Sequence, residues 1–163
     1  MKILIAIEDE IFGEAIAHFV AAHAWPANSE MRLIHVMEPI HVNLLSGYPS
    51  ELIHSVNEER QRAARSLLLK VGTEIAKKIS GVQLKELVLE GHPKDIILDQ
   101  ASEWPADLIV LGSHGRSGMG QFLLGSVSLS IMSAAPCSLM VVKLPKAVAA
   151  VVPEQSGAEL VKN

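Results

Sequence analysis

The chain has 163 residues, with 14 Lys and Arg against 18 Asp and Glu, which gives a formal net charge of −4. Hydrophobic residues make up 49% of the sequence, so a globular fold is expected and a disordered chain is not. Aromatic residues make up only 4%, which argues against a surface that stacks single-stranded bases. The negative balance argues against a duplex-binding protein. The one cysteine, Cys137, rules out an internal disulfide.

The apolar stretches of the sequence are short. The first one, residues 3–7, is followed at once by three acids, which is unlike a signal peptide. No stretch reaches the roughly 18 apolar residues that suggest a membrane-spanning helix. We therefore expect a cytoplasmic protein with no membrane and no nucleic acid as a partner.

Short apolar runs alternate along the chain with segments of helical periodicity. Gly81 suits the left-handed end of the second helix, and Pro93 suits the first turn of the third. In chain order the sequence predicts a strand at 3–7, a helix from Phe12 to near Trp25, a strand at 31–37, a long helix from Leu52 to Ile79, a strand at 82–89, a helix at 93–104, a strand at 108–111, a glycine-rich segment at 112–120, a short helix at 127–134 and a strand at 139–142.

This alternation predicts the α/β class, with a parallel sheet covered by helices on both faces. The weakly apolar and turn-rich residues 146–163 differ from the rest. We expect residues 1–145 to form one domain and residues 146–163 to form a loosely ordered C-terminal tail.

Two strand ends are candidates for a ligand site, because open parallel sheets bind ligands beyond the carboxyl ends of their strands. Glu8 follows the first strand. The segment 112–120, with four glycines, follows the fourth, and Gly125 and Ser126 open the next helix. Backbone N–H groups and the positive end of a helix favour a phosphate, and Arg116 adds a cation.

The glycine-rich segment is neither a Walker A loop nor a dinucleotide fingerprint. His114 within it suits either a phosphate donor or a solvated loop histidine, and both readings stay open. No nucleophile and base are spaced as a catalytic motif, and the histidines have no metal-ligand spacing. We therefore predict no catalytic residue and no structural metal.

Residues 108–142 closely resemble the universal stress protein family. The family signature is Gly, two residues, Gly, nine residues, Gly, and then Ser or Thr. In this chain it consists of Gly112, Gly115, Gly125 and Ser126, with no insertion. The flanking segments 107–110 and 135–138 also fit the pattern, and a looser match extends over residues 2–143.

The resemblance implies a five-stranded parallel sheet in the order 3-2-1-4-5, a Rossmann-like fold similar to that of adenine nucleotide alpha hydrolases. It also implies a site for ATP or a related adenine nucleotide, with Mg²⁺ as a candidate companion. The base would be held near Ala6 and by the backbone of Val36. Glu8 stands where the family has an Asp that contacts the sugar. The remaining residues expected at the nucleotide are Gly112, His114, Gly115, Arg116, Gly125, Ser126, Val127 and Ser128.

The function that we expect from the resemblance is a stress-response protein that uses nucleotide occupancy as a conformational switch. It is further expected to form a homodimer through the edge strand Leu139–Val142. Two alternatives remain. One is a weak Mg²⁺-dependent ATPase or nucleotidyl hydrolase. The other is a member that binds no nucleotide and acts through protein contacts, which the adjacent acids Glu8, Asp9 and Glu10 favour because they would repel phosphates.

Overall fold

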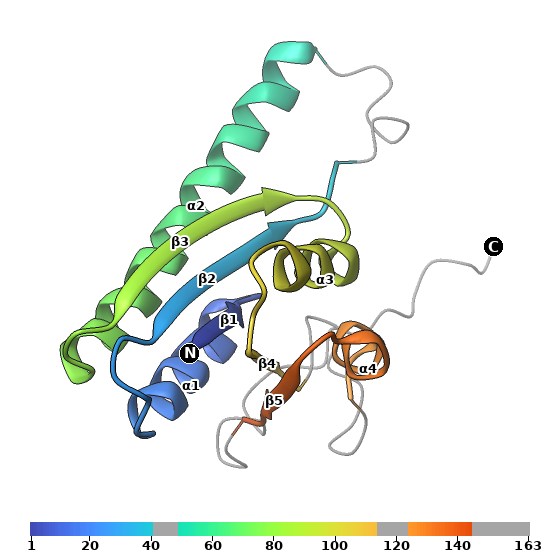
Figure 1. The fold of residues 1–163 in the computed structure, drawn as a ribbon. Helices are drawn as coiled ribbons and strands as arrows, with labels where there is room; N and C mark the ends of the chain where they lie inside the picture. The colour runs from blue at the N-terminus through green and yellow to red at the C-terminus, as the bar shows by residue number, and fades with distance from the viewer. Residues whose placement is uncertain (41–48, 114–123, 145–163) are drawn as a thin grey trace.

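The computed structural model describes residues 1–40, 49–113 and 124–144. Five strands form one parallel sheet in the order β3-β2-β1-β4-β5, which confirms the predicted fold and strand order (Figure 1). The strands are β1 (Lys2–Ala6), β2 (Glu30–Met37), β3 (Gln83–Glu90), β4 (Leu108–Gly112) and β5 (Ser138–Val142). The helices are α1 (Glu10–Ala21), α2 (Ser50–Lys78), α3 (Pro93–Glu103) and α4 (Ser126–Ala134). The predicted tail 146–163 lies outside the described residues.

Helices cover both faces of the sheet, with α1 and α2 on one face and α3 and α4 on the other (Figure 1). Successive strand residues point to opposite faces. In β1, Ile3 and Ile5 pack in the core under α1 and α2, whereas Leu4 packs in the core under α3. All three are fully buried. This burial on both faces explains why the strands read as continuous apolar runs.

The first helix is shorter than its apolar pattern predicts, because it ends at Ala21 instead of near Trp25. The N–H of Ala22 is shared between the carbonyls of His18 and Phe19, both at 3.1 Å. The indole Nε1–H of Trp25 donates to the carbonyl of Val20 at 2.8 Å. Trp25 therefore folds back onto the helix end, which continues the apolar face without continuing the helix.

The second helix extends past the sheet, and its N-terminal turns project beyond the ends of β2 and β3 (Figure 1). Its buried residues begin at Ala64. Before that point, Leu52 and Val56 are 47% and 44% exposed. Among the described residues, no helix combines the length and apolar composition needed to cross a membrane.

Candidate functional site

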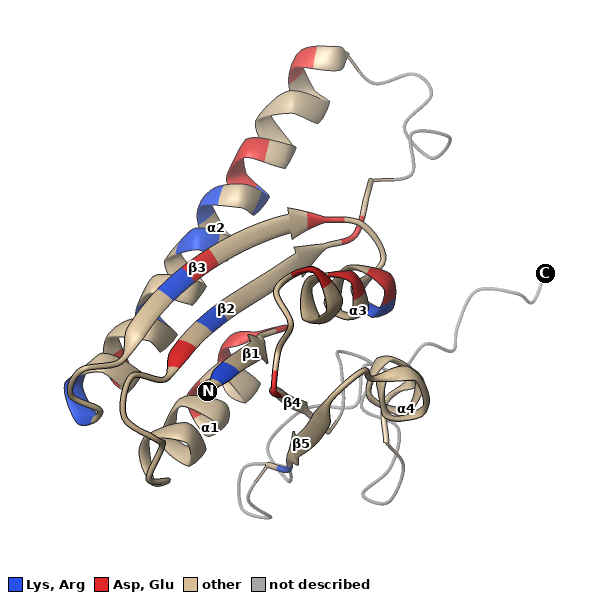
Figure 2. Ribbon diagram, viewed as in Figure 1, with Lys and Arg blue, Asp and Glu red and all other residues tan. Residues whose placement is uncertain are grey.

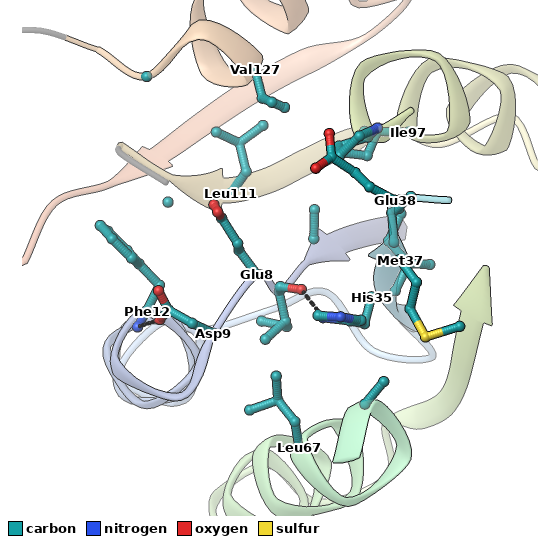
Figure 3. Close-up of a pocket in the computed structure, with 18 of the residues that line it drawn as sticks. Glu8, Asp9, Phe12, His35, Met37, Glu38, Leu67, Ile97, Leu111 and Val127 are labelled. Carbon is teal, nitrogen blue, oxygen red and sulfur yellow. Dashed lines mark hydrogen bonds between the residues drawn. The ribbon is translucent and has the colours of Figure 1, made fainter. Parts of the chain in front are cut away.

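A pocket of about 710 Å³ lies beyond the carboxyl ends of β1, β2 and β4 (Figure 3). It is lined by every sequence-predicted site residue that the structure describes. These eight residues are Ala6, Glu8, Val36, Gly112, Gly125, Ser126, Val127 and Ser128. The other three predicted residues, His114, Gly115 and Arg116, lie outside the described residues.

The strand order explains the position of the pocket. β1 pairs with β2 on one side and with β4 on the other, in a register that aligns Ile5 with Leu33 and with Val110. The chain leaves β1 for α1 on one face and leaves β4 for α4 on the other (Figure 1). Because the two connections diverge, a crevice opens between them at this edge of the sheet.

Gly112 ends β4 directly under the ring of Phe12. A Cβ atom at Gly112 would lie 2.5 Å from Cδ1 of Phe12, which is too close for any side chain. Phe12 comes from the first turn of α1, is 6% exposed and also lines the pocket. The glycine is thus needed for packing, whereas the sequence suggested only a phosphate-binding reason for it.

The first turn of α4 faces the pocket without a side-chain cap. Gly125 is the N-cap residue, and its own N–H donates to the carbonyl of Ser113 at 2.8 Å. The first N–H groups of a helix have no intrahelical partner, and they carry the positive end of the helix dipole. The N–H groups of Ser126, Val127 and Ser128 therefore form the donor side of the pocket.

The two serines of this turn differ in what their hydroxyls can do. The hydroxyl of Ser128 is buried and donates to the carbonyl of Gly112 at 2.7 Å. This bond fixes α4 to the end of β4. The backbone N–H is then the donor that Ser128 contributes to the pocket. Ser126 is exposed and lines the pocket.

The three acids after β1 do not all face the pocket, so the expectation of a common acidic field is wrong for Glu10. Asp9 caps α1, because its Oδ1 accepts the N–H of Phe12 at 2.8 Å. Glu10 forms an ion pair with Lys70 of α2, whose hydrogen bond and charge lower the pKa of the Glu10 carboxyl. Glu8 and Asp9 line the pocket and Glu10 does not.

Three further polar residues of the pocket were not proposed from the sequence. His35 Nδ1 lies 2.9 Å from the carbonyl oxygen of Ile7, which only accepts, so the ring donates at Nδ1 (Figure 3). Arg60 of α2 donates from Nη2 to the carbonyl of Glu38 at 2.7 Å. His35, Glu38 and Arg60 all line the pocket. No local motif marks them, because separate elements bring them together.

The described residues contain no group of three or more His, Cys, Asp or Glu side chains arranged to hold a metal ion. Cys137 lies outside the pocket lining, at the start of β5. Burial, with a smaller contribution from the Asp107 charge, raises the pKa of the Cys137 thiol.

The comparison to known proteins agrees with the fold. The model of the universal stress protein family matches residues 1–143. This chain belongs to that family. Among universal stress proteins, the chain is 30% identical to one of Thermus aquaticus over 142 residues, which is 86% of this chain and 97% of that protein. It is 29% identical to Sll1388 of Synechocystis over 152 residues, covering 87% and 97% of the two chains.

Solved structures share the fold of this universal stress protein. The hypothetical protein MJ0577 superposes with a TM-score of 0.69 at 23% identity, covering 89% of this chain and 96% of its own. Three other neighbours are complexes with adenine nucleotides. One is a universal stress protein with cAMP (TM-score 0.63, 17% identity, 89% and 98% covered). The second is an Arabidopsis thaliana protein with AMP (TM-score 0.64, 18% identity, 90% and 94% covered). The third is an Archaeoglobus fulgidus universal stress protein with dAMP (TM-score 0.57, 21% identity, 88% and 98% covered).

Proposed function

We propose that this chain is a cytoplasmic stress-response protein whose pocket binds ATP or a related adenine nucleotide and uses its occupancy as a conformational switch. The observation that carries the proposal is the convergence of the eight described residues on one pocket between β1 and β4. They come from β1, β2, β4, α4 and the segments beside them, so the fold and not the sequence order brings them together. The AMP, dAMP and cAMP complexes of the structural neighbours support the choice of ligand class.

In this proposal each part of the nucleotide meets a different side of the pocket. The N–H groups of the first α4 turn and the Ser126 hydroxyl hold phosphate oxygens, because both donate and the helix end is positive. The backbone of Val36 holds the base, with Ala6 beside it. Glu8 accepts a hydrogen bond from a sugar hydroxyl. Mg²⁺ would enter with the phosphates and offset the negative charge of Glu8.

Calorimetric titration with ATP and Mg²⁺ tests the binding. Saturable heat and a matching thermal shift are expected, with weaker binding by Ser126→Ala. Ser133→Ala is the matched control, because Ser133 is an exposed serine at the other end of α4 and lies outside the pocket lining. If millimolar ATP gives neither heat nor a thermal shift, the chain acts through protein contacts instead.

Single-turnover measurements separate a switch from an enzyme. We expect bound ATP to stay intact on the timescale of binding. Hydrolysis that is lost in Glu8→Ala or Ser126→Ala would instead identify a slow ATPase, since both residues line the pocket.

We also propose a homodimer in which two copies meet at β5. This strand ends the sheet and pairs only with β4 among the described residues. An open edge presents unpaired N–H and C=O groups, which a second strand can satisfy. Neither β5 nor α4 beside it carries a charged residue (Figure 2). On α4, Leu129 and Met132 are 57% and 50% exposed, which adds apolar area next to the edge.

A further inference from the structure

The pocket contains an acid that the proposed nucleotide contacts leave unused. Glu38 directly follows β2, lies two residues beyond Val36, and lines the pocket together with it. Figure 3 shows the carboxylate of Glu38 directed into the part of the pocket bounded by Ile97 and Leu111. Both of these apolar residues belong to the core under α3 and line the pocket. Glu38 therefore borders the region in which the proposed function places the base.

The backbone of Glu38 is held in place from another element. Arg60, in the part of α2 before its buried residues begin, donates from Nη2 to the Glu38 carbonyl at 2.7 Å. Arg60 is half-buried and lines the pocket with Glu38. The guanidinium bonds the backbone carbonyl oxygen of Glu38, and Figure 3 shows the Glu38 carboxylate directed into the pocket. The bond thus ties the backbone at the end of β2 to α2 next to the pocket.

A carboxylate at this place discriminates between purines by whether the group at position 6 of the base donates or accepts a hydrogen bond. It only accepts, so it pairs with the 6-amino group of adenine and is repelled by the 6-oxo group of hypoxanthine. We infer that Glu38 is a specificity-determining residue that reads the amino group of the bound base. The inference rests on the proposed function, because it deepens the recognition of the nucleotide at that same pocket. Glu38 acts on the choice of base and leaves the phosphate contacts to α4.

Titration with AMP and with IMP tests this inference, because the two differ only at the 6-position and the adjacent N1. AMP has a 6-amino donor and an unprotonated N1, whereas IMP has a 6-oxo acceptor and an N1–H. The wild-type chain should bind AMP about fivefold or more tighter than IMP, as expected for one charge-assisted hydrogen bond partly weakened by water. In Glu38→Ala the AMP affinity should fall while the IMP affinity stays or rises, so that the ratio approaches one. Glu38→Gln should also reduce the ratio, because its amide can turn a donor toward the 6-oxo group.

Glu90→Gln is the matched control. Glu90 is also an exposed acid at a strand end, opposite Met37 in the β2–β3 register, but it lies outside the pocket lining. Its AMP to IMP ratio should equal that of the wild type. Thermal melts of all variants show whether the fold is retained.

The outcomes separate this inference from the function on which it rests. If AMP binds but Glu38→Ala keeps the wild-type ratio, the inference is overturned and the nucleotide site stands. If IMP binds as tightly as AMP to the wild type, the inference is likewise overturned. If neither nucleotide binds the folded wild-type chain, the proposed function fails and takes the inference with it.

Discussion

Phe12 of α1 and Gly112 of β4 are in contact across the floor of the pocket, and a Cβ atom at Gly112 would lie 2.5 Å from the Phe12 ring. The two residues are a hundred positions apart in the sequence. Both residues line the pocket, so their contact forms part of its wall. The site therefore depends on a packing contact as well as on its polar groups.

Gly112→Ala is expected to lower the free energy of unfolding by about 1–3 kcal/mol, the usual cost of overpacking a core. Urea denaturation measures it. Phe12→Ala alone should also destabilise, because it removes a ring that is 6% exposed. The double variant tests the cause: since Phe12→Ala removes the obstructing ring, Gly112→Ala should cost much less in that background. Additive losses would show that the strain lies elsewhere.

Alanine substitutions of Ser126 and Ser128 should affect different properties, nucleotide binding for Ser126 and stability for Ser128. Ser128→Ala leaves the partly buried carbonyl of Gly112 without this donor, so we expect a loss of about 1–2 kcal/mol in the free energy of unfolding. Ser126 is exposed, so Ser126→Ala should leave the melting temperature nearly unchanged and weaken nucleotide binding. Thermal melts and calorimetric titrations of both variants check the pair. A stable Ser128→Ala protein would contradict the assigned hydrogen bond.

Val141→Pro should dissociate the proposed homodimer. The carbonyl of Val142 accepts the N–H of Ser113, so Val142 faces β4 and the N–H of Val141 faces the open edge. Proline at Val141 thus removes an outward donor while leaving the pairing with β4 intact. Light scattering coupled to size-exclusion chromatography should show a monomer.

Val141→Ala is the control for that variant, because it trims the side chain and keeps the N–H. It should remain dimeric. A dimer that persists in a folded Val141→Pro protein would place the interface away from β5.

The thiol of Cys137 should react slowly with alkylating reagents at neutral pH. Burial first, and the Asp107 charge second, raise its pKa, so the thiolate fraction is smaller than in a free thiol. The alkylation rate plotted against pH should reach its midpoint above that of free cysteine measured alongside. A midpoint pH equal to or below that of free cysteine would mean that the Cys137 pKa is not raised, which would contradict the effect expected from its burial.

Apolar periodicity in the sequence predicted the strands, and the two strand ends singled out as candidates both line the pocket. The strand order came from the family resemblance, which the spaced glycine motif carries. The sequence predicted the end of α1 poorly, since the hydrogen bond from Trp25 to Val20 lets an apolar residue pack on the helix without belonging to it. It also grouped Glu10 with Glu8, although the partner of Glu10 is Lys70, sixty residues away.

Contacts between distant elements account for what was missed in the site. Arg60 and Glu38 have no motif in common, and the bond between them exists only because α2 passes the end of β2. Ser128 was expected at the nucleotide from the resemblance, and the structure shows that its hydroxyl is bonded to the carbonyl of Gly112. Hydrogen-bond partners of this kind become visible only when the positions of the separate helices and strands are known.

The hydrogen bonds around Ser113 have a consequence for how a ligand would enter. Its N–H donates to Val142, its carbonyl accepts from Gly125, and the adjacent Gly112 accepts from Ser128. These hydrogen bonds therefore join the end of β4 to the start of α4. In the proposed nucleotide complex, a phosphate would meet donors that are already in place, so its binding energy need not bring the two elements together. Association should then be fast and largely enthalpic at this half of the pocket.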